Sequence, residues 1–352
     1  MGKHEVQKEK KKTSALKIIG IIFLVILVLV VMLAGVGLGF VYSKLGKMNV
    51  EEIDETDIGL TEETQERLSG YRNIAIFGID SRADDYGLGN RSDCIIIASL
   101  NQDTKDIKLI SVYRDTYLQM ESNKKQILDK ATHAYSYGGA QNAVKMLNTN
   151  LDLNIAEYVT VNFDAVVAAV DAMGGITLDI DNSEIKYMND YISTTSSITG
   201  VKSKSITRAG KQTVDGVQAV AYSRIRYTAG GDYKRTERMR TVIEAMLRKA
   251  KTLSLGKLNN LVDTILPKVS TNITATEILG LAPSIASFNI TESVGWPYET
   301  RGTSTGTYYG VPITLESNVE KLHKEVFEQP DYVVSETVKD ISNQMIKKTG
   351  YK

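Results

Sequence analysis

The feature that most constrains this chain is a long uncharged apolar segment near its N-terminus. Ile18–Val41 contains no charged residue, and as a helix it would be roughly 36 Å long, enough to cross the hydrocarbon core of a bilayer. A cleaved signal peptide would have a shorter apolar region and a small-residue cleavage motif. Here the apolar segment runs directly into Tyr42-Ser43-Lys44. We therefore predict a transmembrane helix over residues 18–42 that is retained as a membrane anchor.

The charges on either side of this segment predict its orientation. The residues before it are rich in lysine, at Lys3, Lys8, Lys10, Lys11, Lys12 and Lys17. The residues after it become acidic, at Glu51, Glu52, Asp54, Glu55 and Asp57. Because positive charge favours the cytoplasmic side, residues 1–17 are predicted to form a cytoplasmic tail, and everything after residue 43 is predicted to lie outside the cell.

Composition excludes several classes of function. The 42 basic and 42 acidic residues balance, so only local clusters of charge can explain a charged partner. The single cysteine, Cys94, lies in the apolar run "CIIIASL" and rules out a disulfide scaffold. The three histidines lie far apart in the sequence, so a zinc site is not indicated. No glycine-rich phosphate loop, G-x-S-x-G or H-E-x-x-H motif is present. An enzyme with this sequence would use aspartates and arginines.

Residues 43–70 are polar and acidic, and we interpret them as a stalk that holds a short helix in "TEETQERLSG". A single extracellular domain is predicted over 71–340. It begins with three isoleucine-rich runs of strand length, "NIAIFGI", "CIIIASL" and "DIKLISVY". Further strands are predicted in "AEYVTVNF", "GITLDI" and "SVGWPYE", and helices in "GGAQNAVKMLNTNL" and "FDAVVAAVDAMGG". The segments "ATEILGLAPSIASF" and "ESNVEKLHKEVF" are expected to complete the same domain. The Ser/Thr-rich residues 191–207 are predicted to form an exposed loop or ragged hairpin. The pattern indicates an α/β fold in which helices cover a sheet.

The first three strands predict a cluster of charged residues. If they form an antiparallel meander, the end of the first, the start of the second and the end of the third share one edge of the sheet. The charged residues at those strand ends are Asp80, Arg91, Asp93, Arg114 and Asp115. Two carboxylates can hold Mg²⁺ together with phosphate oxygens, and arginine supplies paired donors for phosphate. This edge is therefore predicted to bind a metal-bridged polyphosphate.

A second basic stretch, "YSRIRYTAGGDYKRTERMR", divides into parts. Arg224 and Arg226 stand two residues apart, so in an extended segment their side chains would project from the same face. An amphipathic helix is predicted from Thr236 onward, and on its projection Arg235 points inward. Arg238 and Arg240 fall near the margins of the apolar stripe and are predicted to be solvated.

These residues resemble the LytR-CpsA-Psr family of Gram-positive cell-envelope proteins. The resemblance covers about residues 71–250 and is carried by "NIAIFGIDSR", "NRSDCIIIASLNQDTKDIKLISVYRDTYL", "THAYSYGG", "YVTVNFDAVVAAVDAMGGITLDI" and "VDGVQAVAYSRIRYTAGGDYKRTERMR". It implies an α/β fold with a central mixed β-sheet flanked by helices. It also implies a bound polyprenyl pyrophosphate, with the lipid tail in an apolar tunnel and Mg²⁺ on the pyrophosphate. Phe163–Met173 and Val242–Leu247 are candidates for the tunnel wall.

The resemblance also implies roles for individual residues. Asp80 and Asp93 would hold Mg²⁺. The pyrophosphate would be bound by Arg91, Arg114, Arg224, Arg226 and Arg235. Asp80, Arg91, Arg114 and Asp232 would take part in catalysis, with Asp80 as the most plausible base if it is not fully occupied by the metal. Met239 stands where the family frequently has glutamine, which removes a possible polar contact beside Arg235.

The implied reaction transfers a phosphate-linked glycopolymer, such as wall teichoic acid or capsular polysaccharide, from its polyprenyl pyrophosphate carrier to a peptidoglycan hydroxyl, and releases polyprenyl phosphate. A hydrolase that attacks the same pyrophosphate with water is an alternative that the residues leave open. A membrane-anchored lipid-binding regulator or scaffold without turnover is another. Nucleic-acid binding is not expected, because the arginines are predicted to lie outside the cell and the chain lacks net positive charge.

Overall fold

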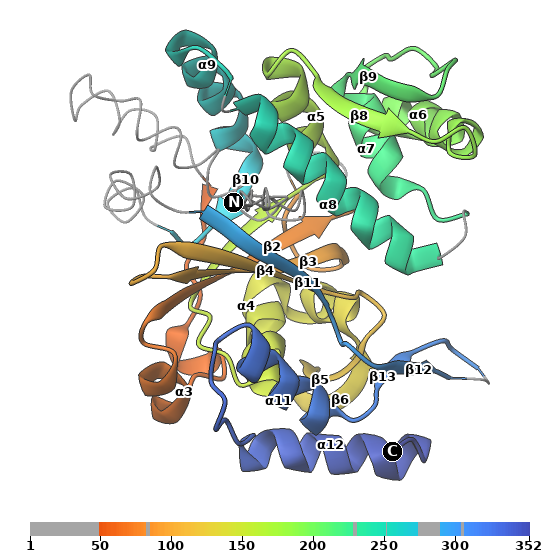
Figure 1. Ribbon diagram of the computed structural model, residues 1–352. Coiled ribbons are helices and arrows are strands. Elements are labelled where there is room, and N and C mark those ends of the chain that lie inside the picture. Colours follow the sequence, from red (N-terminus) through yellow and green to blue (C-terminus); the bar gives the residue numbers. More distant parts are fainter. Residues whose placement is uncertain (1–48, 82–84, 228–230, 251, 274–288, 304–305) are drawn as a thin grey trace, which may run out of the picture.

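A mixed sheet forms the centre of the domain (Figure 1). The computed structural model describes residues 49–81, 85–227, 231–250, 252–273, 289–303 and 306–352. Within them, the sheet has seven strands in the order β1 (Asn49–Val50), β10 (Val269–Thr271), β7 (Glu157–Val161), β2 (Tyr71–Ile79), β3 (Ser92–Asn101), β4 (Asp106–Val112) and β11 (Asn289–Trp296). Strand β2 pairs antiparallel with β3 and parallel with β7, so the sheet is mixed as predicted.

Helices cover both faces of this sheet (Figure 1). One face carries α5 (Phe163–Ala172), α6 (Ile185–Thr199), α7 (Gly216–Arg224), α8 (Gly231–Ala250) and α9 (Leu255–Ile265). The other carries α4 (Ala131–Leu151), α11 (Leu315–Glu325) and α12 (Glu336–Thr349). Along β2, Ile74 and Ile76 pack into the first core, whereas Ala75 and Phe77 pack into the second. Successive side chains of a strand point to opposite faces, so a strand buried on both sides has a continuous apolar sequence.

Three two-stranded sheets lie around this core: β5 (Tyr117–Ser122) with β6 (Lys125–Lys130), β8 (Ile176–Ile180) with β9 (Gly210–Val214), and β12 (Thr300–Gly302) with β13 (Gly310–Pro312). Strand β6 leads directly into α4, which begins at Ala131. This hairpin therefore fixes the entry of α4 beside the end of β4, where Thr132 donates its backbone N–H to the carbonyl of Arg114 at 2.9 Å.

The predicted meander is confirmed. Ile79 at the end of β2 pairs with Ser92 at the start of β3, and Ile95 pairs with Val112 at the end of β4. The three strand ends therefore meet at one edge of the sheet. The helices predicted in 138–151 and 163–175 are also present, as α4 and α5.

Two local predictions were wrong. The Ser/Thr-rich segment 191–207 is helical up to Thr199, because Met188, Ile192 and Thr195 place a buried stripe along α6 at helical spacing. The helix ends at Gly200, which has a φ of 71°. Arg224 was placed in an extended segment, but it is the last residue of α7. The chain becomes extended only at Ile225, with φ −61° and ψ 125°.

Part of the predicted stalk belongs to the domain. The short helix is present as α3 (Glu62–Arg67), capped by Thr61. However, Ile58 and Leu68 are fully buried in the second core, and β1 pairs with β10. The acidic surface of this segment conceals two apolar side chains that bind it to the domain, so residues 49–70 are not a free stalk.

Several predictions lie outside the described residues. These are the cytoplasmic tail over 1–17, the transmembrane helix over 18–42 and the segment 275–288 that was expected to complete the domain. Among the helices that the structure does describe, none combines the length and apolar character needed to span a membrane.

Candidate active site

The charged residues predicted at the sheet edge face those of the second basic stretch. Asp80 follows β2, and Asp93 lies at the start of β3. Arg224 and Arg226 come from the end of α7, and Arg235 comes from the second turn of α8. These five side chains, with Phe163, Tyr191 and Met239, line a cavity of about 190 Å³. We call it the charged cavity.

Asp93 is the centre of the ion pairs in this cavity. Its Oδ1 accepts from Nη1 of Arg114. Its Oδ2 lies 3.2 Å from Nη2 of Arg226 and 3.8 Å from Nη1 of Arg235. Arg235 is only 1% exposed, which confirms that it points inward. One carboxylate thus faces three guanidinium groups, so the surroundings of Asp93 carry an excess of positive charge suited to a second anion.

Arg224 is held by contacts that leave its charge uncompensated at close range. Its guanidinium lies 4.7 Å from the centre of the Phe163 ring and 5.2 Å from that of Tyr191, and Nη1 donates to Thr195 Oγ1 at 3.0 Å. Burial lowers the pKa of Arg224, and the negative charge of Asp80 opposes this effect. A half-buried cation stacked on aromatic rings gains from an anion in the cavity.

The ion pairs continue beyond Arg114 to residues that sequence reasoning missed. Nε of Arg114 lies 3.5 Å from Oδ1 of Asp115, and the same oxygen lies 3.0 Å from Nζ of Lys130. Lys130 ends β6 and precedes α4. The only sequence signal for Lys130 was its position next to "THAYSYGG", and no local spacing connects it with Asp115.

An apolar cavity of about 90 Å³ adjoins the charged cavity. Asp93, Phe163 and Met239 line both. The remaining walls are mostly aliphatic and come from β2, α5, α7 and α8, with Ile76, Val166, Val220, Val242, Ile243 and Met246 among them. Cys94 also lines this cavity, and burial raises its pKa to about 12. The thiol is therefore protonated and behaves as a small apolar group.

The LytR_cpsA_psr family model matches residues 40–325. The chain belongs to the LytR-CpsA-Psr family. It is 35% identical to the polyisoprenyl-teichoic acid–peptidoglycan teichoic acid transferase TagU of Enterococcus faecalis, over 73% of this chain and 78% of TagU.

Solved structures of family members share the fold. The crystal structure of Bacillus subtilis TagV is 26% identical, with a TM-score of 0.56 over 75% of this chain and 98% of TagV. The family protein YwtF (TagT) with bound octaprenyl pyrophosphate lipid is 22% identical, with a TM-score of 0.50 over 87% of this chain and 97% of that one. The second likeness concerns the fold alone.

The remaining predicted family residues occupy different surroundings. Asp80 is exposed, and its backbone N–H donates to the carbonyl of Arg91 at 3.4 Å. The side chain of Arg91 is exposed and is not among the residues that line the charged cavity. Asp232 lies in the first turn of α8, but its side chain is outside the described part of the structure. The roles of these residues stay predictions.

The prediction that Arg238 is solvated was wrong. Arg238 is 6% exposed, and its Nε donates to Oε1 of Glu184 at 2.7 Å. Its Nη1 donates to the carbonyl of Ile225 at 3.2 Å. Arg240 is half-buried, and within the described residues its Nη1 has no hydrogen-bond partner. The buried side of α8 is therefore wider than its apolar stripe. It also includes Arg238, which pairs with the buried carboxylate of Glu184.

The donor set of the charged cavity fits a Mg²⁺ ion bound together with phosphate. Asp80 and Asp93 both face the cavity. In the part of the chain that the structure describes, no group of three or more histidine, cysteine or carboxylate side chains gathers to hold a metal. Mg²⁺ usually takes one or two carboxylates and completes its octahedron with waters and substrate phosphates. Two carboxylates beside an anion site match this mode of binding better than an all-protein cage.

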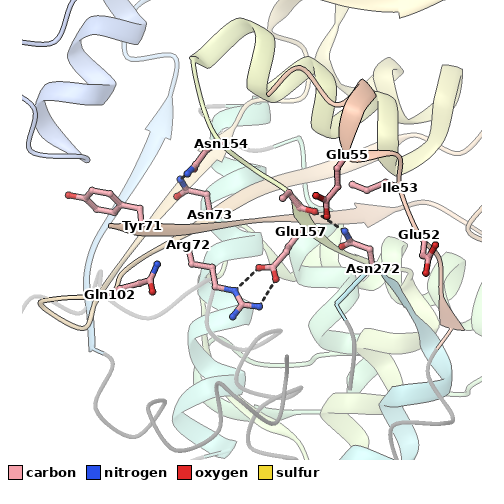
Figure 2. Close-up of a pocket in the computed structure, with 11 residues that line it drawn as sticks. Glu52, Ile53, Glu55, Tyr71, Arg72, Asn73, Gln102, Asn154, Glu157 and Asn272 are labelled. Carbon is pink, nitrogen blue, oxygen red and sulfur yellow. Dashed lines mark hydrogen bonds and ion pairs between the residues drawn. The ribbon is translucent and has the colours of Figure 1, made fainter. Parts of the chain in front are cut away.

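A larger cavity of about 540 Å³ lies at the other end of β2 (Figure 2). Carboxylates and amides dominate its walls. Its one arginine, Arg72, pairs with Glu157, where Nε lies 2.6 Å from Oε2. Glu52 and Glu55 add further negative charge. This lining repels phosphate, so the greater volume of this cavity does not make it the phosphate-binding site.

Proposed function

We propose that this protein is a Mg²⁺-dependent transferase that moves a phosphate-linked glycopolymer from a polyprenyl pyrophosphate carrier to peptidoglycan and releases polyprenyl phosphate. One observation carries the proposal: the charged cavity opens against an apolar cavity, and the two share Asp93, Phe163 and Met239. A ligand that fits both has an anionic head and an apolar tail. A pyrophosphate on a polyprenyl chain has this composition.

The relatives support the chemical class of the substrate. TagU of Enterococcus faecalis is named a polyisoprenyl-teichoic acid–peptidoglycan teichoic acid transferase, and YwtF (TagT) has been solved with octaprenyl pyrophosphate. We extend this to a protein anchored by residues 18–42, with its domain outside the cell. There the carrier lipid and peptidoglycan are both within reach.

In the proposed reaction, Arg224, Arg226 and Arg235 hold the pyrophosphate while Phe163 and Met239 separate it from the lipid. A sugar hydroxyl of peptidoglycan attacks the phosphorus that carries the glycopolymer, and the bond to the polyprenyl phosphate oxygen breaks. Guanidinium groups stabilise the charge that spreads over the phosphoryl oxygens, without moving during the reaction. Asp80 and Asp93 would hold Mg²⁺, which when bound neutralises charge on the phosphate oxygens.

The reaction can be tested with the purified protein in detergent. A polyprenyl-pyrophosphate-linked glycan and a peptidoglycan acceptor would be supplied with Mg²⁺ or with EDTA. We expect a phosphodiester-linked product and released polyprenyl phosphate in Mg²⁺ only. Equal product in EDTA would remove the metal from the proposal. Release of the lipid phosphate with free glycan phosphate, and no attachment to peptidoglycan, would identify a hydrolase instead.

A binding-only scaffold predicts a different result. It would retain the lipid in both conditions and would release nothing. Arg224→Gln and Arg235→Gln should each weaken binding of the lipid pyrophosphate, because each removes one of the cations that face the cavity. If both variants bind the lipid as tightly as the parent protein, the charged cavity is not the head-group site.

A further inference from the structure

A carboxylate, a histidine and a tyrosine form a compact group where β6 leads into α4. Asp129 lies near the end of β6, and His133 and Tyr137 lie one turn apart in α4. Nδ1 of His133 lies 2.9 Å from Oδ2 of Asp129, and Oη of Tyr137 donates to the same oxygen at 2.7 Å. The backbone N–H of Lys130 donates to Oδ1 at 2.8 Å.

These contacts fix the tautomer of the histidine. Burial raises the pKa of Asp129, but hydrogen bonds from Tyr137 and His133 outweigh it and leave the pKa below its usual value. An ionised carboxylate only accepts hydrogen bonds, so Nδ1 of His133 must donate. In the neutral ring, Nε2 then carries the lone pair, and among the described residues no partner engages it. Such a nitrogen is an available proton acceptor.

Two paths of contacts connect this group with the candidate active site. Ion pairs lead from Asp93 through Arg114 and Asp115 to Lys130, the neighbour of Asp129. In addition, the first turn of α4 hydrogen-bonds to the carbonyl of Arg114. The charge of Arg91 also acts on the hydroxyl of Tyr137. The group is therefore linked to the candidate active site through Arg114 and the start of α4.

Tyrosine rings surround the same group. Tyr137 is 40% exposed and its ring centre lies 5.9 Å from that of His133. Tyr308 is 48% exposed, and Nζ of Lys130 lies 6.0 Å from its ring and 5.9 Å from that of Tyr309. Exposed rings with polar groups between them suit a sugar, whose C–H faces pack on aromatic rings while its hydroxyls make hydrogen bonds.

We propose that His133, oriented by Asp129, is the proton acceptor for the attacking hydroxyl, and that Tyr137 and Tyr308 bind the saccharide that carries it. The proposal rests on the proposed function and names the acceptor side of that site. As the hydroxyl oxygen bonds to phosphorus, its proton moves to Nε2 of His133 and the bond from phosphorus to the polyprenyl phosphate oxygen breaks. The imidazolium then releases the proton to water. With His133 as the base, Asp80 would act as a metal ligand only.

The test uses the full-length protein in the transfer assay. We expect His133→Gln to lower kcat about 100-fold, since a positioned base contributes at least this factor, and to leave the affinity for lipid pyrophosphate unchanged. His133→Ala should regain part of its activity when imidazole is added. Asp129→Asn should also lower kcat, because a neutral amide no longer fixes the tautomer. The same change at Asp103, exposed in the turn between β3 and β4, is the matched control.

The saccharide contacts have a separate readout. Tyr308→Ala should raise KM for the peptidoglycan acceptor several-fold with little change in kcat. His133→Gln with parental kcat would overturn the assignment of the base, and unchanged acceptor KM in both Tyr137→Ala and Tyr308→Ala would overturn the saccharide surface. These failures differ from failure of the proposed function, in which the parent protein itself would transfer nothing. A loss of activity that imidazole does not restore, together with a lowered melting temperature, would assign the group a structural role instead.

Discussion

Replacing Asp93 by asparagine should destabilise the folded protein even without substrate. Asp93 forms ion pairs with Arg114, Arg226 and Arg235 at the charged cavity. Its side chain is 17% exposed, that of Arg114 is 15% exposed and that of Arg235 is 1% exposed. Removing this carboxylate takes away part of the charge compensation of cations that are largely shielded from water.

The size of the effect follows from these exposures. Breaking a buried ion pair costs about 3–5 kcal/mol. The pair with Arg226 is discounted, because that side chain is 41% exposed and water screens it. Asp93 and Arg114 retain some contact with water, so we expect the lower end, about 3 kcal/mol. A domain of about 300 residues unfolds with an entropy near 0.6 kcal/mol per kelvin, so the melting temperature should fall by about 5 °C.

Asp80→Asn is the matched control, because Asp80 lines the same cavity but is exposed. The free energy of unfolding of Asp80→Asn should differ from that of the parent protein by less than about 0.5 kcal/mol. Both variants should lose transfer activity. Inorganic pyrophosphate should stabilise the parent protein more than Asp93→Asn in the presence of Mg²⁺, if Asp93 is a metal ligand. Thermal unfolding followed by circular dichroism measures all three proteins. Equal melting temperatures for the parent and Asp93→Asn would refute the reasoning that this carboxylate balances the arginines.

Three further predictions concern groups outside the ion pairs of Asp93. Arg238→Leu should lower the free energy of unfolding, measured by chemical denaturation, by about 3–5 kcal/mol, because the buried Glu184 loses its cationic partner. The double variant with Glu184→Leu should recover most of that loss. Cys94 should resist iodoacetamide at pH 8 in the native protein and react after unfolding, because burial raises its pKa to about 12 and only the thiolate attacks; mass spectrometry would detect early labelling that contradicts this. Burial lowers the pKa of His323, so the unfolded chain binds the proton more readily, and stability should fall as the pH drops below about 6.5. His323→Gln should show a smaller loss between pH 7 and pH 5.5 than the parent, and equal slopes would contradict the assignment.

The sequence predicted the central strands well because their signal is local. Isoleucine-rich runs such as 94–100 are long enough to be strands, and their order along the chain brings their ends together. The inward direction of Arg235 was predictable for the same reason, since it depends only on the phase of one helix.

The contacts that the sequence did not predict are made between distant segments. Arg238 is buried because Glu184 comes to it from 54 residues away, and no helical projection contains that partner. The buried side of α6 was not evident from the sequence, because serines and threonines dominate the segment and one of them, Thr195, joins Met188 and Ile192 in the buried stripe. Asp115 meets Lys130 only because the β5–β6 hairpin turns the chain back.

The packing of residues 49–70 has a mechanical consequence. Any tension that reaches the domain at Asn49 first meets β1, which has only two paired residues and can peel away. The contacts that resist after β1 include the hydrogen bonds from Tyr158 Oη to the carbonyl of Glu51 and from Asn148 Nδ2 to that of Ile58. They transmit force into β7 and α4, whereas Asp80 and Asp93 lie where β2 ends and β3 begins. Tension applied at the N-terminal side of the domain would therefore break the contacts of residues 49–58 before it distorted the charged cavity.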